Sequence, residues 1–207
     1  MKHFLYTLVL LFLLGCSSES QDSLEFNDTV KSIFSTPEIE DLNKILTFFE
    51  SEIFEKAETD CSSISTCYQP FFDKMKSNEE AGEFNIEISF EKQQKLYQSI
   101  DSSTFNQIWS FSWGTVRNGD SRDTLKMMLW NNEGKYFEFL EKFAKEEVVV
   151  QNYYETYTKA GTISPSMVAG LIMYHDKYDI KDIRFRLLIA IHYLTLNDER
   201  KRKEKVE

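Results

Sequence analysis

The chain is poor in glycine and proline, which number 7 and 3 among its 207 residues. This scarcity excludes collagen-like and low-complexity proteins, which need far more of both residues. Disorder is excluded as well, because 42% of the residues are apolar and 17 Phe and 10 Tyr supply bulky side chains for a core. At this length the sequence therefore predicts one folded domain.

Basic residues are also in short supply, with 24 Lys and Arg against 34 Asp and Glu, so the formal net charge is −10. A nucleic-acid binder needs a concentrated basic face that attracts phosphate groups. We therefore expect no nucleic acid among the partners of this protein.

The apolar run at the N-terminus, Phe4–Leu14, is too short to span a bilayer. As a helix, its eleven residues would measure about 16 Å, against about 30 Å of bilayer hydrocarbon. Lys2 and His3 precede the run. A basic start followed by a short apolar stretch is typical of an export signal peptide.

The run ends in Leu13-Leu14-Gly15-Cys16, which resembles the lipobox of bacterial lipoproteins. The resemblance covers residues 1–16 and implies that residues 1–15 are a cleaved signal peptide. It also implies that Cys16 carries a diacylglyceryl lipid on its thiol and an acyl chain on its new amino group. The expected localisation is then the bacterial cell envelope, where the lipid anchors the protein. The residue after the cysteine, Ser17, resembles those of lipoproteins that are sorted to the outer membrane by default. The membrane face stays open, and an ordinary signal peptide cut elsewhere is the alternative.

Removal of residues 1–15 takes away Lys2 and no acid, so the formal charge would become −10 − 1 = −11. Residues 16–34 are polar and lack helical periodicity until their end, so we expect them to form a flexible lipidated tether. The remaining residues, 35–207, are expected to form a single helical domain whose charged C-terminal tail is solvated.

Apolar side chains that recur every three or four residues predict helices along this domain. Ser35 and Glu38 have the spacing of a capping box, and Pro37 suits the first turn of a helix that continues to about Ala57. The fold class is therefore mainly α, an irregular multi-helix bundle. One short strand or hairpin is allowed around residues 83–117, where Glu83–Phe90 alternates.

Four further helices are expected in the second half of the chain, over residues 125–130, over residues 136–159, over residues 164–174 and from residue 181 past residue 196. The last of these is apolar nearly all round from Leu187 to Leu194. A helix with that pattern has no polar face to turn toward water, so it should lie at the centre of the fold.

Cys61 and Cys67 are the two cysteines that remain after lipidation of Cys16. An isolated pair in an exported protein predicts a disulfide. In one straight helix their Cα atoms would be about 9 Å apart, so a bridge requires a bend between them.

No catalytic or metal-binding constellation emerges from the sequence, and we expect no metal and no cofactor. His175 and His192 are too few and too far apart along the chain to form a metal site. Glu133, Glu138 and Glu141 leave open a carboxylate pair of the kind used by glycosidases. The protein is therefore interpreted as a non-enzyme, with a carboxylate-dependent hydrolase of envelope polymers kept as an alternative.

Aromatic residues cluster around residues 105–117, and Trp109, Trp113 and Arg117 are the candidate partner-binding residues. Exposed tryptophan beside arginine is typical of protein-binding surfaces. Filling of the core by the same aromatic side chains is the alternative.

Three functional hypotheses follow from these patterns. The first is a lipid-anchored envelope protein whose helical domain binds another envelope protein or helps to maintain the envelope. The second is a periplasmic inhibitor or immunity-type lipoprotein, in which an acidic domain matches a basic target. The third is the hydrolase of envelope polymers.

Overall fold

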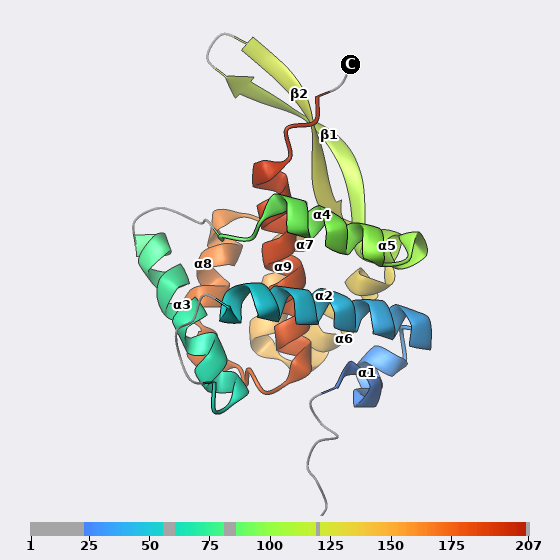
Figure 1. Ribbon diagram of the computed structural model, residues 1–207, viewed down its shortest axis with the longest axis vertical. Helices are drawn as coiled ribbons and strands as arrows, with labels where there is room; N and C mark the ends of the chain where they lie inside the picture. Colours follow the sequence, from blue (N-terminus) through green and yellow to red (C-terminus); the bar gives the residue numbers. More distant parts are fainter. Residues whose placement is uncertain (1–22, 56–60, 81–85, 119–120, 206–207) are drawn as a thin grey trace, which may run out of the picture.

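The computed structural model describes residues 23–55, 61–80, 86–118 and 121–205. These residues form nine α-helices, two short 3-10 helices and one antiparallel hairpin (Figure 1), which confirms the mainly α fold. In chain order the elements are η2 (Leu24–Phe26), α1 (Asp28–Lys31), α2 (Thr36–Phe54), α3 (Ile64–Glu80), α4 (Phe90–Ser99), α5 (Ser102–Ile108), β1 (Trp109–Asn118), β2 (Ser121–Trp130), α6 (Lys135–Glu146), α7 (Val148–Ala160), α8 (Pro165–Met173), η3 (His175–Lys177) and α9 (Ile183–Lys201).

Helix α9 forms the centre of the fold, as its apolar sequence predicts. Figure 1 shows it running through the middle of the molecule with the other helices around it. Every residue from Leu187 to Leu194 is at most 1% exposed. This helix therefore supplies the surface on which the other elements bury their apolar faces.

Polar side chains on α9 fix its neighbours at defined positions. Arg186 Nε donates to Glu50 Oε1 of α2 at 2.8 Å, and Asn197 Nδ2 donates to Gln93 Oε1 of α4 at 2.5 Å. Thr195 accepts hydrogen bonds from the hairpin. Because a buried polar group is costly without a partner, these contacts favour one arrangement of the surrounding helices over others.

Helix α2 begins where the sequence predicts. The backbone N–H of Ser35 donates to Glu38 Oε2 at 2.7 Å, which forms the expected capping box, and Pro37 lies in the first turn. Lys135 of α6 lies 2.6 Å from the same carboxylate. The Glu38 carboxylate thus both caps α2 and forms an ion pair with α6.

The hairpin projects from one end of the molecule along its longest axis (Figure 1). Its two strands pair from Trp109 opposite Trp130 at the base to Asn118 opposite Ser121 at the tip. The hairpin allowed around residues 83–117 therefore exists, but it occupies residues 109–130. The described residues 86–89 lead into α4 without strand pairing.

The prediction of a helix over residues 125–130 is wrong, because this segment lies in β2. A run of six mostly apolar residues fits a buried helix turn as well as a strand. Pairing with β1 decides between them and buries Met128 and Trp130.

The single long helix expected over residues 136–159 is instead two helices, α6 and α7. Glu147 separates them with an extended backbone at φ −129° and ψ 116°. Three consecutive valines follow, and β-branched residues favour helices less than unbranched ones do. The break lets α7 turn so that Tyr153 and Tyr157 pack against Trp130 of the hairpin.

The folded domain begins earlier than residue 35, so the expected extent of the tether is wrong. Ser23 and Asn27 cap η2 and α1, and Leu24 and Val30 are fully buried. Helices of three and four residues are too short to show a period in the sequence. The rest of the expected tether, residues 16–22, and the signal peptide lie outside the described residues.

The expected solvated C-terminal tail is also wrong in its first part. Helix α9 continues to Lys201, and Asp198 within it is completely buried. Arg202 Nε lies 2.7 Å from Asp198 Oδ1. The buried carboxylate therefore keeps a cation beside it, and Gln94 Nε2 of α4 donates to its other oxygen at 3.1 Å, which ties the end of α9 to the body.

Candidate partner-binding surface

The base of the hairpin belongs to the core. Trp109 is fully buried, and its indole N–H donates to Thr195 Oγ1 at 2.8 Å. The indole N–H of Trp130 donates to the same oxygen at 3.0 Å. The prediction that Trp109 contacts a partner is therefore wrong, and the core-filling alternative holds for this residue.

Farther along β1 the aromatic side chains come to the surface. Phe111 is 42% exposed and Trp113 is 52% exposed. The Lys126 ammonium lies 4.6 Å from the centroid of the Phe111 ring, and the Arg202 guanidinium lies 4.9 Å from it. These cation–π contacts hold Phe111 in place, while Trp113 presents about half of its side chain to solvent.

Side chains alternate between the two sides of a strand, so every second residue of the hairpin shares one side. We call the exposed part of the side that carries Trp113 the hairpin face; it begins at Phe111, and its cross-strand pairs are Trp113–Lys126, Thr115–Thr124 and Arg117–Arg122.

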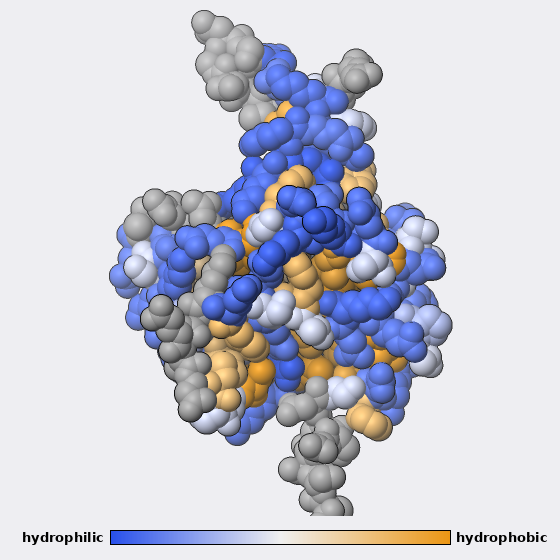
Figure 2. Space-filling model, in the orientation of Figure 1, coloured by the Kyte–Doolittle hydropathy of each residue, from blue (hydrophilic) through white to orange (hydrophobic). Residues whose placement is uncertain are grey.

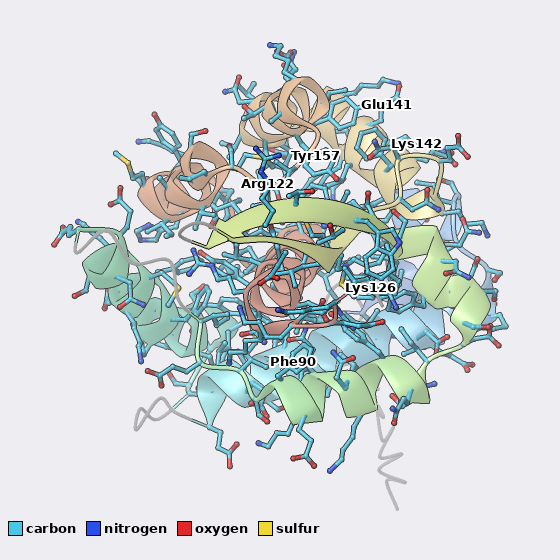
Figure 3. The ribbon with its side chains drawn as sticks, turned by 90° about the horizontal axis from the view of Figure 1, so that it is seen from above. Phe90, Arg122, Lys126, Glu141, Lys142 and Tyr157 are labelled. Carbon is cyan, nitrogen blue, oxygen red and sulfur yellow. The ribbon has the colours of Figure 1, made fainter. Side chains whose placement is uncertain are left out.

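The hairpin face changes from aromatic near the body to basic at the tip. Seen from above, Arg122 extends from the hairpin (Figure 3) and is exposed, whereas the Lys126 side chain is only 26% exposed. Arg117 lies in β1 opposite Arg122, but its side chain is not among the parts that the structure describes. Figure 2 shows the projecting part as largely hydrophilic, with small apolar areas near its junction with the body.

The C-terminal tail covers the outer edge of β2. The backbone N–H of Lys126 donates to the carbonyl of Glu204 at 2.9 Å, and Leu125 forms an antiparallel bridge with Lys205. The Lys126 ammonium also pairs with the Glu204 carboxylate at 2.9 Å and holds the pKa of that carboxyl below its ordinary value. Lys126 is therefore a paired cation.

Cys16 lies outside the described residues, so its lipidation stays a prediction. Cys61 and Cys67 are described as free cysteines, exposed and buried respectively, without the expected bridge. Burial raises the pKa of the Cys67 thiol to about 11, and its hydrogen bond with Cys61 adds to this shift. The two thiols are thus neighbours, and a disulfide under oxidising conditions remains a prediction.

The two histidines among the described residues, His175 and His192, have packing roles. His175 stacks on Phe72 with ring centroids 4.8 Å apart. His192 is fully buried, and a 2.7 Å hydrogen bond joins its Nδ1 to Tyr153 Oη. Within the described residues, no group of three or more His, Cys, Asp or Glu side chains is arranged to hold a metal ion.

The carboxylates that suggested a hydrolase lie on the surface. Glu133, Glu138 and Glu141 are all exposed. Glu138 pairs with Lys142 at 3.0 Å, and Glu141 pairs with Lys145 at 2.8 Å, one turn farther along α6. Pairing with lysines on an exposed helix face is the usual arrangement of solvated carboxylates, so these residues give the hydrolase alternative no support.

A groove of about 680 Å³ between α2 and α4 is lined by three lysines, Lys44, Lys92 and Lys95. Each of them already has a carboxylate partner at 2.7 Å; the pairs are Lys44–Asp41, Lys92–Glu52 and Lys95–Glu91. The groove therefore offers no unpaired lysine among these three for an anionic ligand.

Sequence reasoning found Trp113 but missed the strand opposite it. Arg122 and Lys126 lie four residues apart in a segment that we expected to be partly helical. Arg122, Asp123 and Thr124 are all polar, so the sequence has no polar–apolar alternation there that would predict a strand.

Comparisons with known proteins add no further support for a function. No protein-family model, no curated protein and no solved structure matched this chain. None of the helices in the described ranges has the length and hydropathy that crossing a membrane requires.

Proposed function

We propose that this protein is a lipid-anchored protein of the bacterial cell envelope whose hairpin face binds another envelope protein. The lipobox-like sequence that ends in Cys16 supports the anchor. The observation that carries the binding role is the exposure of Trp113, at 52%, on an element that projects from the body. Tryptophan is among the residues that contribute most to protein–protein binding.

The position of the hairpin suits this role. The described chain begins near α1, at the opposite end of the longest axis from the hairpin (Figure 1). Six residues lie between Cys16 and Ser23, and even a fully extended chain over these seven Cα–Cα steps reaches only about 25 Å. A protein anchored at Cys16 would therefore stay close to its membrane and could direct the hairpin away from it.

Metabolic labelling with a palmitate analogue tests the anchor. We expect label in the wild-type protein and none in Cys16→Ser, because that substitution removes the acylated thiol. Cys61→Ser is the matched control and should keep the label. Equal labelling of wild-type protein and Cys16→Ser would contradict lipidation at this residue.

Photo-crosslinking in intact cells tests the binding surface. A photoreactive residue in place of Trp113 should give one discrete crosslinked product. Co-expression of an excess of the chain without the photoreactive residue should reduce the amount of this product. Tyr174 is the matched control, because it is 53% exposed at the end of α8. The same crosslinked product from both positions would mean that the hairpin face has no special role.

A further inference from the structure

The structure leaves one edge of the hairpin open. The tail residues Glu204 and Lys205 lie along the outer edge of β2. On the other side, β1 pairs only with β2 among the described residues. The N–H of Trp109, at its base, donates to the carbonyl of Phe105 in α5, and no other backbone hydrogen bond is seen between β1 and a further described segment. A strand in this position presents unpaired backbone donors and acceptors to an incoming chain.

The contact with the tail shows which residues of β1 face outward. The N–H of Lys126 points away from β1, because it donates to Glu204. In an antiparallel ladder, Lys126 and the opposite residue Trp113 then form a pair that is not hydrogen-bonded to each other. The backbone groups of Trp113 therefore point outward at the free edge, as do those of Phe111 and Thr115 two residues away on either side.

The sequence of β1 lacks the usual protection of an edge strand. Natural edges are blunted by proline, lysine or inward-pointing charges. Trp109–Asn118 contains no proline, no lysine and no acid, and its one charged residue is Arg117. An edge of this length without such residues is open to pairing with another chain.

The charges at the tip indicate the chemistry of the incoming strand. Arg117 and Arg122 are directly opposite each other in the register, and like charges in that position destabilise a hairpin. Arg122 is exposed and forms no ion pair with any described residue. A carboxylate on an added strand would give Arg122 the ion-pair partner that it lacks among the described residues.

We propose that the free edge of β1 binds an extended, acidic segment of the partner protein as an added strand. The backbone groups of Phe111, Trp113 and Thr115 supply the hydrogen bonds, and Trp113 and the arginines select the side chains. This inference rests on the proposed function. A second copy of the chain fits less well because it would bring a second Arg117 and Arg122 to the same edge. The anchoring membrane fits less well because the described chain begins at the end of the molecule opposite the hairpin.

A pair of substitutions at Thr115 separates the backbone from the side chain. Thr115→Pro removes an outward N–H, and proline is tolerated at such an edge position because the β1–β2 ladder does not use that group. Thr115→Val changes the side chain but keeps the N–H. Circular dichroism and thermal unfolding of both full-length variants verify that the fold is retained.

Binding is measured with labelled peptides as long as β1, in which valine alternates with either glutamate or lysine. We expect the glutamate peptide to bind the purified full-length chain about tenfold more tightly than the lysine peptide. Thr115→Pro should weaken this binding about tenfold, whereas Thr115→Val should change it less than about twofold.

A second pair of variants tests the charge. Arg122→Glu should weaken binding of the glutamate peptide about tenfold and improve binding of the lysine peptide. Lys181→Glu makes the same change of charge at an exposed residue just before the other end of α9, and should leave both affinities unchanged.

Equal affinity for the two peptides, or unchanged peptide binding by Thr115→Pro, would overturn the proposal. So would a dimer of the wild-type chain that Thr115→Pro dissociates. A last contrary outcome is no peptide binding together with a blue shift of Trp113 fluorescence when phosphatidylglycerol vesicles are added. Failure of the proposed function is distinguishable. Retained lipid label in Cys16→Ser would refute the anchor without affecting the peptide assay. A Trp113 crosslink that persists in Thr115→Pro would refute strand addition but not the binding surface.

Discussion

At the scale of single residues, Thr195 joins the hairpin to the central helix. Its hydroxyl accepts from the indole N–H groups of Trp109 and Trp130 and donates to the carbonyl of Ile191 at 2.7 Å. We expect Thr195→Val to lower the free energy of unfolding by about 2 to 5 kcal/mol, because two buried N–H donors lose their acceptor. Urea unfolding measures this loss.

The matched control is Thr195→Ser, which keeps the oxygen and removes one methyl group. It should cost only about 1 kcal/mol. Similar losses in both variants would mean that packing of the methyl group, and not the hydrogen bonds to the tryptophans, connects the hairpin to α9.

At the scale of elements, Gly134 sets how closely α6 approaches α5. A Cβ atom at this position would lie 2.3 Å from the backbone oxygen of Gln107, which is closer than any real contact. Gly134→Ala should therefore destabilise the protein by about 1 to 3 kcal/mol through overpacking, with a lower unfolding temperature in calorimetry.

Gly170 in α8 provides the opposite case for comparison. No atom lies within 4 Å of a Cβ placed there. Gly170→Ala should stabilise the protein by about 0.5 to 1 kcal/mol, because alanine favours a helix more than glycine does. If Gly170→Ala destabilised the protein as much as Gly134→Ala does, the close approach of α5 and α6 could not be the reason for the loss of stability in Gly134→Ala.

At the scale of the whole molecule, buried His192 couples folding to pH. Burial lowers its pKa from the ordinary value of 6.5 to about 3. Between these values the unfolded chain binds a proton that the folded protein does not, so acid favours unfolding. We expect the free energy of unfolding to fall by up to about 1.4 kcal/mol per unit as the pH drops below 6.5. Urea unfolding at several pH values measures this slope.

His192→Gln should abolish that slope between pH 6.5 and 5 even if the variant is less stable, and His175→Gln should keep it. Glu38 contributes only at lower pH. Burial alone would raise the pKa of Glu38, but hydrogen bonds from Lys135 and Ser35 lower it overall. The stabilising effect of Glu38 is therefore lost only as the pH falls below 4.5, the ordinary pKa of this carboxyl. An unchanged slope in His192→Gln would exclude His192 as the cause of the pH dependence above pH 5.

Much of the fold could be predicted because long helices leave a repeated signal. The capping box at Ser35 and the nearly all-apolar stretch from Leu187 to Leu194 are both found where expected. Short segments lack that signal. Leu24 and Val30 sit in helices of three and four residues, and the six residues of 125–130 fit a helix turn as well as a strand.

The candidate site was only partly predictable for a related reason. The sequence marks Trp109 and Trp113 equally, since both lie in the same aromatic cluster. Trp109 is buried and Trp113 is exposed. This difference arises because Thr195, 86 residues away from Trp109 along the chain, provides a buried hydrogen-bond acceptor for the Trp109 indole. Trp113 lies four residues farther along β1, where the hairpin has left the body.

The sequence by itself determined the mainly α fold class, the start of α2 and the central burial of α9, because these depend on periodicity and capping within one segment. It is also the sole basis for the expected lipid on Cys16. Only the tertiary structure decided which aromatic residues are exposed, that residues 121–130 form a strand, and that β1 keeps a free edge. Each of these depends on contacts between distant segments, and no local pattern encodes them.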